Sequence, residues 1–366
     1  DTVYKSSAVG FYSALFSGIV FSLLCTFGQI PLLNILGADV KTAEATAAYL
    51  QWTVNFGAVP SILNVVMAYL VRAEGASLHA SIGTMSGCLM NMILDPIFIL
   101  PQGLDMGAAG AGMATCISNC FACMYFFVLL YVRKKSTYVC IQLSQCKFKR
   151  EIVLGICGVG IPASIQNLLN VTGMTILNNF TAGFGADAVA AMGITQKINM
   201  VPMNIAMGMS QGIMPLISYN YSSRNYKRMK GTLLFSARIS LGFLAVVAIG
   251  YYVGAGKLIS LFMENETIIA YGTRFLRGFC IGLPFLCMDF LAVGVFQAVG
   301  MGKHALGFAI MRKIILEIPA IYILNAIFPL YGLAYTQFTA ELVLAVAAVI
   351  VLMRLFRKLE NRAETE

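Results

Sequence analysis

Ten long runs of mostly apolar residues constrain the fold of this chain more than any other feature of its sequence. A helix needs roughly 20 mostly apolar residues to cross the hydrocarbon core of a bilayer, and many of these runs are too long for buried helices of a soluble core. The runs lie near residues 8–36, 47–71, 77–100, 107–132, 151–180, 187–219, 230–262, 267–298, 303–328 and 331–356. The sequence therefore predicts an all-α polytopic membrane protein.

The amino-acid composition agrees with a lipid environment. Hydrophobic residues make up 59% of the chain and charged residues only 11%, and the mean hydropathy is +0.80. These values exceed those of ordinary globular proteins. We therefore expect the lipid bilayer to be the main partner of this surface.

The sequence contains an internal repeat, marked by its only two histidines. Ala73-x-Gly75-x-x-x-His79 recurs 225 positions later as Ala298-x-Gly300-x-x-x-His304. Further landmarks keep this spacing with a small drift: Pro60 with Pro284, Pro96 with Pro319, and Gly110 with Gly332. Internal repeats in strongly apolar chains are typical of secondary transporters, which bind substrate and coupling ion between the two halves.

The offset of the repeat indicates how many helices a full pair of copies would have. Subtracting 225 from the start of the fifth run, residue 151, gives about −74, enough for two more spanning helices. We expect two parallel six-helix repeats, with ten of the twelve helices present in this chain. The predicted divisions are an N-lobe at 1–135, a basic cytoplasmic linker at 136–150 and a C-lobe at 151–366.

The distribution of lysine and arginine predicts the orientation, because short cytoplasmic loops carry an excess of positive charge. Basic residues gather in alternate loops and in the tail, whereas the opposite loops are poor in cations and include Asp39, Lys41, Asp105 and Glu264. The basic sets are Arg133, Lys134, Lys135, Lys147, Lys149 and Arg150; Arg224, Lys227, Arg228 and Lys230; and Arg354, Arg357, Lys358 and Arg362. We predict a multi-pass protein of the cell (inner or plasma) membrane with a cytoplasmic C-terminus. Nucleic acid is not expected as a partner, since the net charge of +9 arises beside helix ends.

Several stretches together resemble the multidrug and toxic compound extrusion (MATE) family, of the bacterial type. They are Arg72-Ala-Glu-Gly75, Asn91-Met-Ile-Leu-Asp95-Pro96, Gly107-Ala-Ala-Gly110, Gly185-Ala-Asp-Ala-Val-Ala-Ala-Met-Gly193, Gly208-Met-Ser-Gln-Gly212 and Tyr219-Asn-Tyr-Ser-Ser-Arg-Asn-Tyr-Lys-Arg228. The resemblance implies two six-helix bundles around a central cavity. It also implies that the family's first two helices are absent, together with an aspartate that helps to bind the coupling cation.

A candidate cation site lies in the first lobe. Asn91 and Asp95 are one helical turn apart and offer oxygen ligands of the kind that a hard cation prefers. Pro96 has no N–H, so it leaves the carbonyl of Met92 without its helical partner. The resemblance adds Thr115 on the next helix and implies that this cluster binds Na⁺ or a proton. The alternative is that Asp95 only reaches toward the outer interface.

The second lobe has a carboxylate deep in a predicted span, Asp289, whose repeat mate is Asn64. Some relatives in the family have a glutamate on the seventh helix, where Asn170 is the nearest match in this chain. Asp289 is expected either to recognise a cationic substrate or to pair with Lys197, Arg312 or Lys313. Glu317, four residues after Lys313, is expected to neutralise that lysine.

Methionines form a stripe on the eighth helix of the family, where flexible and polarisable side chains suit a cavity for substrates of varied shape. The alternative is ordinary helix packing in a chain with 20 methionines. The predicted substrate-cavity residues are Asn170, Gln196, Asn199, Met200, Met203 and Asp289.

The sequence has no Gly-x-Ser-x-Gly, His-Glu-x-x-His or phosphate-binding Gly-Lys-Ser/Thr motif, so we do not expect an enzyme. We predict a monomeric antiporter without a cofactor that exports small hydrophobic or cationic drug-like molecules by alternating access, driven by Na⁺ or H⁺. One alternative is a flippase for lipid-linked oligosaccharides, which would gather Lys197, Arg238, Arg312 and Lys313 around one cavity. The other is a membrane scaffold without transport activity.

Overall fold

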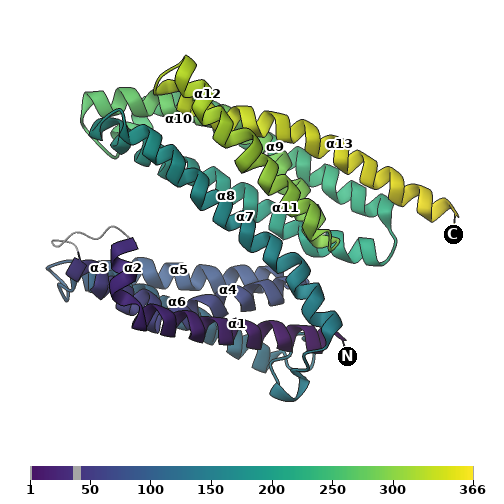
Figure 1. Ribbon diagram of the computed structural model, residues 1–366. Coiled ribbons are helices and arrows are strands. Elements are labelled where there is room, and N and C mark those ends of the chain that lie inside the picture. Colours follow the sequence, from purple (N-terminus) through teal and green to yellow (C-terminus); the bar gives the residue numbers. More distant parts are fainter. Residues whose placement is uncertain (1, 36–42, 366) are drawn as a thin grey trace. The chain divides into compact units, whose positions relative to one another are not determined.

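The computed structural model describes residues 2–35 and 43–365, and these residues form helices without any β-strand. The chain divides into two compact units, unit 1 (residues 1–156) and unit 2 (residues 157–366). The helices of each unit are shown in Figure 1. Asp39 and Lys41, which entered the prediction of orientation, lie outside the described residues, as does the side chain of Arg362.

Unit 1 is a bundle of four main helical segments. The helix α1 packs against α4, and α5 and α6 pack closely against each other. The bounds are α1 Thr2–Phe27, α2 Gln29–Ile35, α3 Ala43–Leu50, the π-helical η1 Gln51–Phe56, α4 Ala58–Ala73, α5 Ser77–Ile99, α6 Gly107–Val132 and the short 3-10 helix η2 Leu143–Gln145.

Unit 2 is built around α10, which packs against α8, α9 and α13. Of the apolar part of α10, 78% is buried, far more than in any other candidate spanning helix of the described residues. The bounds are α7 Arg150–Ala182, α8 Ala186–Ser222, α9 Tyr226–Ser260, α10 Glu266–Ala298, α11 Gly302–Ile310, the π-helical η3 Met311–Glu317, α12 Ile318–Ile327, the 3-10 helix η4 Tyr331–Tyr335 and α13 Thr336–Thr365.

The ten predicted apolar runs fall on ten helical stretches of the structure. Within the described ranges, seven helices are long and apolar enough to cross a membrane, and the pair 43–56 and 58–73, bent by 50°, provides an eighth. The stretches 186–222 and 302–327 fall below this threshold because they carry many polar groups, including Lys197 in the first and Arg312, Lys313 and Glu317 in the second. The prediction of an all-α multi-pass membrane protein is confirmed.

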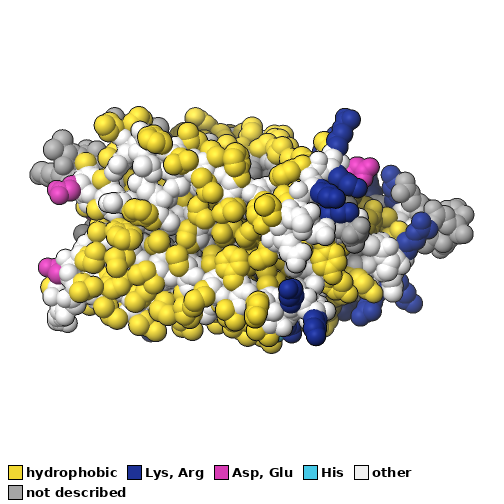
Figure 2. Space-filling model, turned by 90° about the horizontal axis from the view of Figure 1, so that it is seen from below, with side chains coloured by type: hydrophobic (Ala, Val, Ile, Leu, Met, Phe, Trp, Pro, Cys, Tyr) yellow, Lys and Arg dark blue, Asp and Glu magenta, His cyan; other side chains and the backbone are white. Residues whose placement is uncertain are grey.

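The surface supports the same conclusion. Figure 2 shows hydrophobic side chains over most of the face drawn, with lysine and arginine side chains gathered at one side of it. Large apolar side chains such as Phe235, Val246 and Val253 on α9 are at least two-thirds exposed. Such surface is favourable in lipid and costly in water.

The histidine-marked repeat corresponds to two equivalent turns between helices. Gly75 has φ +89° after α4, and Gly300 has φ +76° after α10. This left-handed conformation strains any residue with a Cβ atom, so each copy of the motif requires its glycine. The histidine side chains make different contacts: the Nδ1 of His79 lies 3.4 Å from the Tyr125 hydroxyl, and the ring of His304 lies 5.9 Å from that of Phe296.

Small residues allow close helix packing in both units. A Cβ added at Gly294 on α10 would overlap the Ser210 hydroxyl on α8, and one added at Gly83 on α5 would overlap the Phe126 ring on α6. Helices in membranes associate largely through such close contacts, since lipid provides no hydrophobic drive between them. These contacts fix the positions of the polar side chains described next.

Candidate functional site

Unit 2 contains a pocket of about 180 Å³ between α7, α8, α10, η3 and the start of α13. Five of the six predicted substrate-cavity residues line it: Asn170, Gln196, Asn199, Met200 and Met203. The remaining lining residues are Met174, Leu177, Met207, Phe279, Phe290, Arg312, Lys313, Glu317, Thr336 and Gln337. The pocket thus combines methionine and aromatic walls with buried charged groups.

Two amide side chains at the pocket differ in their hydrogen bonding. The Oδ1 atom of Asn199 is buried without a hydrogen-bond partner, and its Nδ2 donates only to the sulfur of Met203, at 3.7 Å. Gln196 is instead held in place, since its Nε2 donates to Oδ1 of Asn178 on α7 at 3.0 Å. An unpaired amide oxygen in a buried wall is a ready acceptor for a hydrogen-bond donor.

Asp289, the sixth predicted residue, lies behind the pocket wall. Its Oδ2 accepts a hydrogen bond from Nη1 of Arg312 at 3.2 Å, and both side chains are at most 4% exposed. Of the three cationic partners expected for Asp289, the structure selects Arg312. Lys197 is exposed on α8 and does not serve as this partner.

Arg312 also meets a third buried charge, Glu341 on α13. Its Nε lies 2.9 Å from Oε1 of Glu341, whose side chain is fully buried. The N–H is not directed at that oxygen, so the contact is an ion pair without a hydrogen bond, and Oε2 of Glu341 and Oδ1 of Asp289 have no partner either. Incomplete pairing leaves acceptor capacity inside the bundle.

The neighbouring residue Lys313 forms a separate pair. Its Nζ donates to both carboxylate oxygens of Glu317, at 2.8 and 2.6 Å, as expected from their spacing. Both residues belong to η3, a π-helical segment inside the α11–α12 rod. π-Helical turns are rare and frequently mark functional sites. In this case the segment buries two adjacent cations, Arg312 and Lys313, in one helix.

The five buried groups do not balance in charge. When all are ionised, the two cations Arg312 and Lys313 face the three carboxylates of Asp289, Glu317 and Glu341, which leaves a net charge of −1 beside the pocket. An unbalanced charge in a low-dielectric interior favours the approach of a further cation.

Unit 1 has a neutral counterpart of this network. Asn64 on α4 donates through Nδ2 to Oδ1 of Asn119 on α6 at 3.2 Å. The landmark offsets relate Asn64 to Asp289 (289 − 64 = 225) and Asn119 to Glu341 (341 − 119 = 222, as for Gly110 and Gly332). The two units therefore place side chains at equivalent positions but differ in charge.

The predicted cation site of unit 1 is partly assembled. Nδ2 of Asn91 donates to Oδ1 of Asp95 at 3.3 Å, and both side chains are half-buried on α5. Pro96 lies inside the helix, so the carbonyl of Met92 has no donor at position 96. Three kinds of oxygen are thus available along one turn.

Thr115 belongs to α6. The packing of α5 on α6 shows which turn of α5 lies beside it. Gly87 approaches Ser118, and Phe98 approaches Gly110. Because the two helices run antiparallel with this register, Thr115 lies at the level of the turn that contains the asparagine and aspartate. Its hydroxyl donates to its own helix, to the carbonyl of Ala111 at 2.9 Å.

The sequence analysis missed Glu341 and Asn119. Both lie inside long apolar runs, where a single polar residue hardly changes the hydropathy. The repeat offset of 222 relates the two positions and was the signal that would have found them. Within the described part of the chain, no group of three or more His, Cys, Asp or Glu side chains is arranged to hold a metal ion.

Comparisons with known proteins agree with this architecture. A sequence model of the MatE family matches residues 162–323. The multidrug export protein MepA of Staphylococcus saprophyticus is 32% identical over 347 residues, which cover 94% of this chain and 75% of the relative. MepA of Staphylococcus aureus is 33% identical over 354 residues, or 95% of this chain and 76% of the relative.

Solved structures show the same fold. A mutant of a MATE transporter from Vibrio cholerae superposes with a TM-score of 0.89 at 20% identity, covering 97% of this chain and 80% of that one. An outward-facing MATE family transporter of the MOP superfamily gives a TM-score of 0.87 at 24% identity, covering 98% and 84%. The two-lobe fold is confirmed, and together with the sequence relatives it shows that this chain belongs to the MATE family of membrane transporters.

Proposed function

We propose that this protein exports small apolar cations and related drug-like molecules across the cell membrane, in exchange for Na⁺ or H⁺, by alternating access. The observation that carries the proposal is the unit 2 pocket, whose adaptable walls adjoin a buried cluster of three carboxyl groups and two cations. Two relatives with about a third of their residues identical are named multidrug export proteins, which supports the same activity.

The walls of the pocket suit substrates of varied shape. Met200, Met203 and Met207 contribute flexible thioether side chains, and Phe279 and Phe290 contribute aromatic faces. Methionine repacks at low cost and aromatic faces attract cations, so neither feature demands one ligand geometry. Asn199 supplies an acceptor for a donor group of the substrate.

The coupling ion is assigned to Asn91, Asp95 and Thr115. A carboxylate beside amide, hydroxyl and carbonyl oxygens matches the ligand preference of Na⁺, and the carboxylate alone would serve for a proton. In our proposal, ion binding favours one arrangement of the protein and substrate binding favours the other, so inward ion flow drives substrate outward.

Transport and coupling are tested with the full-length protein, including the two N-terminal helices that the repeat predicts, in proteoliposomes. We expect efflux of a fluorescent organic cation when a Na⁺ or H⁺ gradient is imposed, and no efflux without a gradient. Asp95→Asn is expected to abolish the dependence on the gradient, whereas Asp105→Asn, the same change in the exposed loop after α5, should have no effect.

The two parts of the proposal fail separately. If the full-length parent protein moves no organic cation under either gradient, the proposed transport activity is wrong. If Asp95→Asn keeps the gradient dependence of the parent, transport stands and the ion-site assignment is wrong.

The flippase alternative receives little support. It calls for four cations around one cavity, but only Arg312 and Lys313 line the pocket, and each contacts a carboxylate. Lys197 and Arg238 are exposed on α8 and α9. Because both cations already contact carboxyl groups, this pocket would attract a pyrophosphate group only weakly.

We also propose that the protein is a monomer and that its C-terminus lies in the cytoplasm. A fluorescent protein fused after residue 366 should therefore fluoresce, and alkaline phosphatase fused at the same place should be inactive. The reverse pattern would invert the topology.

A further inference from the structure

Unit 2 has a second cavity, a groove of about 640 Å³ between α9, α10 and α13. Its lining differs chemically from that of the polar pocket. Of the described residues, only those of these three helices line it. Its walls are apolar: Leu233, Leu234, Ala237, Met288, Leu291, Val349, Ile350, Leu352, Met353 and Phe356. Leu234, Ile350 and Met353 are more than two-fifths exposed, so the groove opens on the outer surface of the bundle.

Charged side chains line one end of this groove: Lys230 on α9 and Arg354, Arg357 and Glu360 on α13. Lys230 is neutralised by Glu360, with Nζ and Oε1 3.0 Å apart. The structure gives the two arginines no acidic partner within the described residues, and both are exposed. The end of the groove therefore carries a net charge of +2 next to an apolar channel.

A repeat-related groove exists in unit 1, between α1 and α6, with a volume of about 480 Å³. Three α6 residues and the nearby Lys134 line this groove. Adding the offset of 222 to Phe127, Leu130, Tyr131 and Lys134 gives Val349, Leu352, Met353 and Phe356, all of which line the unit 2 groove. Tyr4 on α1, at an offset of 225, falls one residue from Lys230. Both copies of the repeat thus form a groove at the same place.

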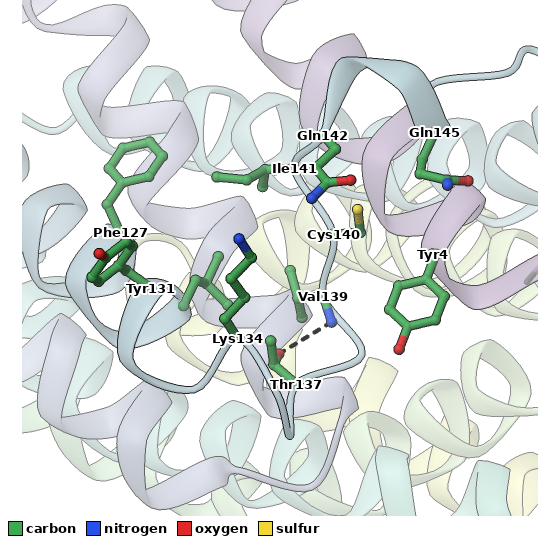
Figure 3. A pocket seen from close by; sticks show the side chains of 11 residues that line it. Tyr4, Phe127, Tyr131, Lys134, Thr137, Val139, Cys140, Ile141, Gln142 and Gln145 are labelled. Atoms are coloured by element: carbon green, nitrogen blue, oxygen red, sulfur yellow. Dashed lines mark hydrogen bonds between the residues drawn. The ribbon is translucent and has the colours of Figure 1, made fainter.

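The unit 1 groove is covered by the chain itself. Figure 3 shows Phe127 and Tyr131 on one side, Tyr4 on the other, and the segment from Thr137 to Gln142 between them. This segment is neither helical nor part of a strand.

The covering segment is firmly attached to α1. Its Cys140 N–H donates to the Ser7 hydroxyl at 3.0 Å, and its Ile141 carbonyl accepts from the Tyr12 hydroxyl at 2.8 Å. Val139 is buried in the core of unit 1. Unit 1 thus closes one side of its groove with a segment of its own chain.

We propose that the groove of unit 2, which no segment of the described chain covers, binds an anionic phospholipid of the surrounding membrane. One acyl chain lies along Leu234, Ala237 and Ile350. The phosphate lies between Arg354 and Arg357, since basic residues at the membrane surface attract anionic headgroups. Arginine also forms bidentate hydrogen bonds with phosphate oxygens. The site is independent of the proposed transport activity.

The test uses tryptophan fluorescence, because the chain has a single tryptophan, Trp52. Trp52→Phe with Leu234→Trp places the reporter in the groove. Trp52→Phe with Phe235→Trp places it on the same helix but outside the groove, where Phe235 is 67% exposed. Each full-length protein is reconstituted in vesicles of brominated phosphatidylglycerol or brominated phosphatidylcholine, and quenching gives the relative binding of the two lipids.

We expect the groove reporter to prefer phosphatidylglycerol about fivefold or more, the effect of roughly one or two basic residues at a membrane surface. The reporter at position 235 should show a ratio near one. Arg354→Gln with Arg357→Gln should remove the preference, whereas Lys227→Gln with Arg228→Gln, an equal charge change at exposed residues outside the groove, should preserve it.

Three results would overturn the proposal. Equal quenching by both lipids at the groove reporter would indicate ordinary boundary lipid. A preference that survives the change of both arginines would exclude them as the headgroup site. Absence of quenching by either lipid would indicate another occupant, such as a second copy of the chain.

Discussion

Arg312 lies between two carboxylates of different helices, and its Nε is 2.9 Å from Oε1 of Glu341 in the interior of unit 2. The same guanidinium donates to Asp289 and lies over the ring of Phe290, 5.4 Å from its centroid. Because Phe290 and Arg312 both line the pocket, the ion pairs join α10, η3 and α13 directly behind the proposed substrate site. The following predictions concern this arrangement and the packing that supports it.

Arg312→Ala should destabilise the protein strongly. It leaves Asp289 and Glu341 buried without a counter-charge, and breaking a buried pair in this way costs about 3–5 kcal/mol. The measurement is the melting temperature in detergent, with Arg238→Ala at an exposed position as the control. Adding Asp289→Asn and Glu341→Gln to Arg312→Ala should restore most of the lost stability. Equal melting temperatures for Arg312→Ala and Arg238→Ala would contradict the prediction.

Changes at the Lys313–Glu317 pair should have opposite effects on substrate affinity. Glu317→Gln leaves the lysine charge at the pocket and should weaken binding of an organic cation roughly tenfold, whereas Lys313→Gln should strengthen it by a similar factor. Both variants lose the same ion pair, so their stabilities should fall together. Binding is measured by fluorescence anisotropy. As a control, the affinity for a neutral ligand of similar size should change in neither variant. Changes of the same sign in the affinity for the organic cation would refute the charge argument.

Gly294→Ala should disrupt the contact of α10 with α8. The new methyl group would overlap the Ser210 hydroxyl, which donates to the Phe290 carbonyl at 2.6 Å, and overpacking typically costs about 1–3 kcal/mol. Gly212→Ala on α8 is the matched control, since nothing lies within 4 Å of a Cβ there. In thermal unfolding, the double variant Ser210→Ala with Gly294→Ala should recover the lost stability. A Gly294→Ala variant as stable as the parent would show that the two helices can move apart at little cost.

The hydrogen bond between Asn64 and Asn119 in unit 1 should tolerate apolar replacement of both partners. Asn119→Leu leaves the Asn64 amide without its partner, at a cost of about 1–3 kcal/mol. Changing both asparagines to leucine removes the buried polar groups together and should recover much of that stability. A double variant less stable than the single one would mean that the amides have further partners.

Apolar length predicted the helices well because the bilayer sets their minimum length, whatever their neighbours. The same criterion does not select 186–222 or 302–327; in the second stretch Arg312, Lys313 and Glu317 interrupt the apolar sequence and belong to a π-helical segment. It also concealed Glu341, because one carboxylate hardly changes the hydropathy of residues 331–356. Hydropathy measures the average of a run, whereas a site depends on single side chains.

The grouping of side chains was predicted unevenly for a similar reason. Asn170, Gln196, Asn199, Met200 and Met203 were proposed together and line one pocket, but their role in substrate binding stays a prediction. The choice of Arg312 rather than Lys197 as the partner of Asp289 required the packing of η3 on α10 and α13. Spacing along one helix shows which residues share a face, but it does not show which helix that face meets.

The sequence by itself determined the membrane environment, the helical fold, the duplication and its offset, because these follow from local apolarity and from comparison of the chain with itself. Only the tertiary structure decided that equivalent positions of the repeat contain a neutral Asn64–Asn119 bridge in one unit and the Asp289–Arg312–Glu341 ion pairs in the other. It likewise decided that residues 137–142 lie against the groove of unit 1 and that no described segment lies against the groove of unit 2. The physical reason is that charge balance and groove closure depend on contacts between residues far apart in the chain.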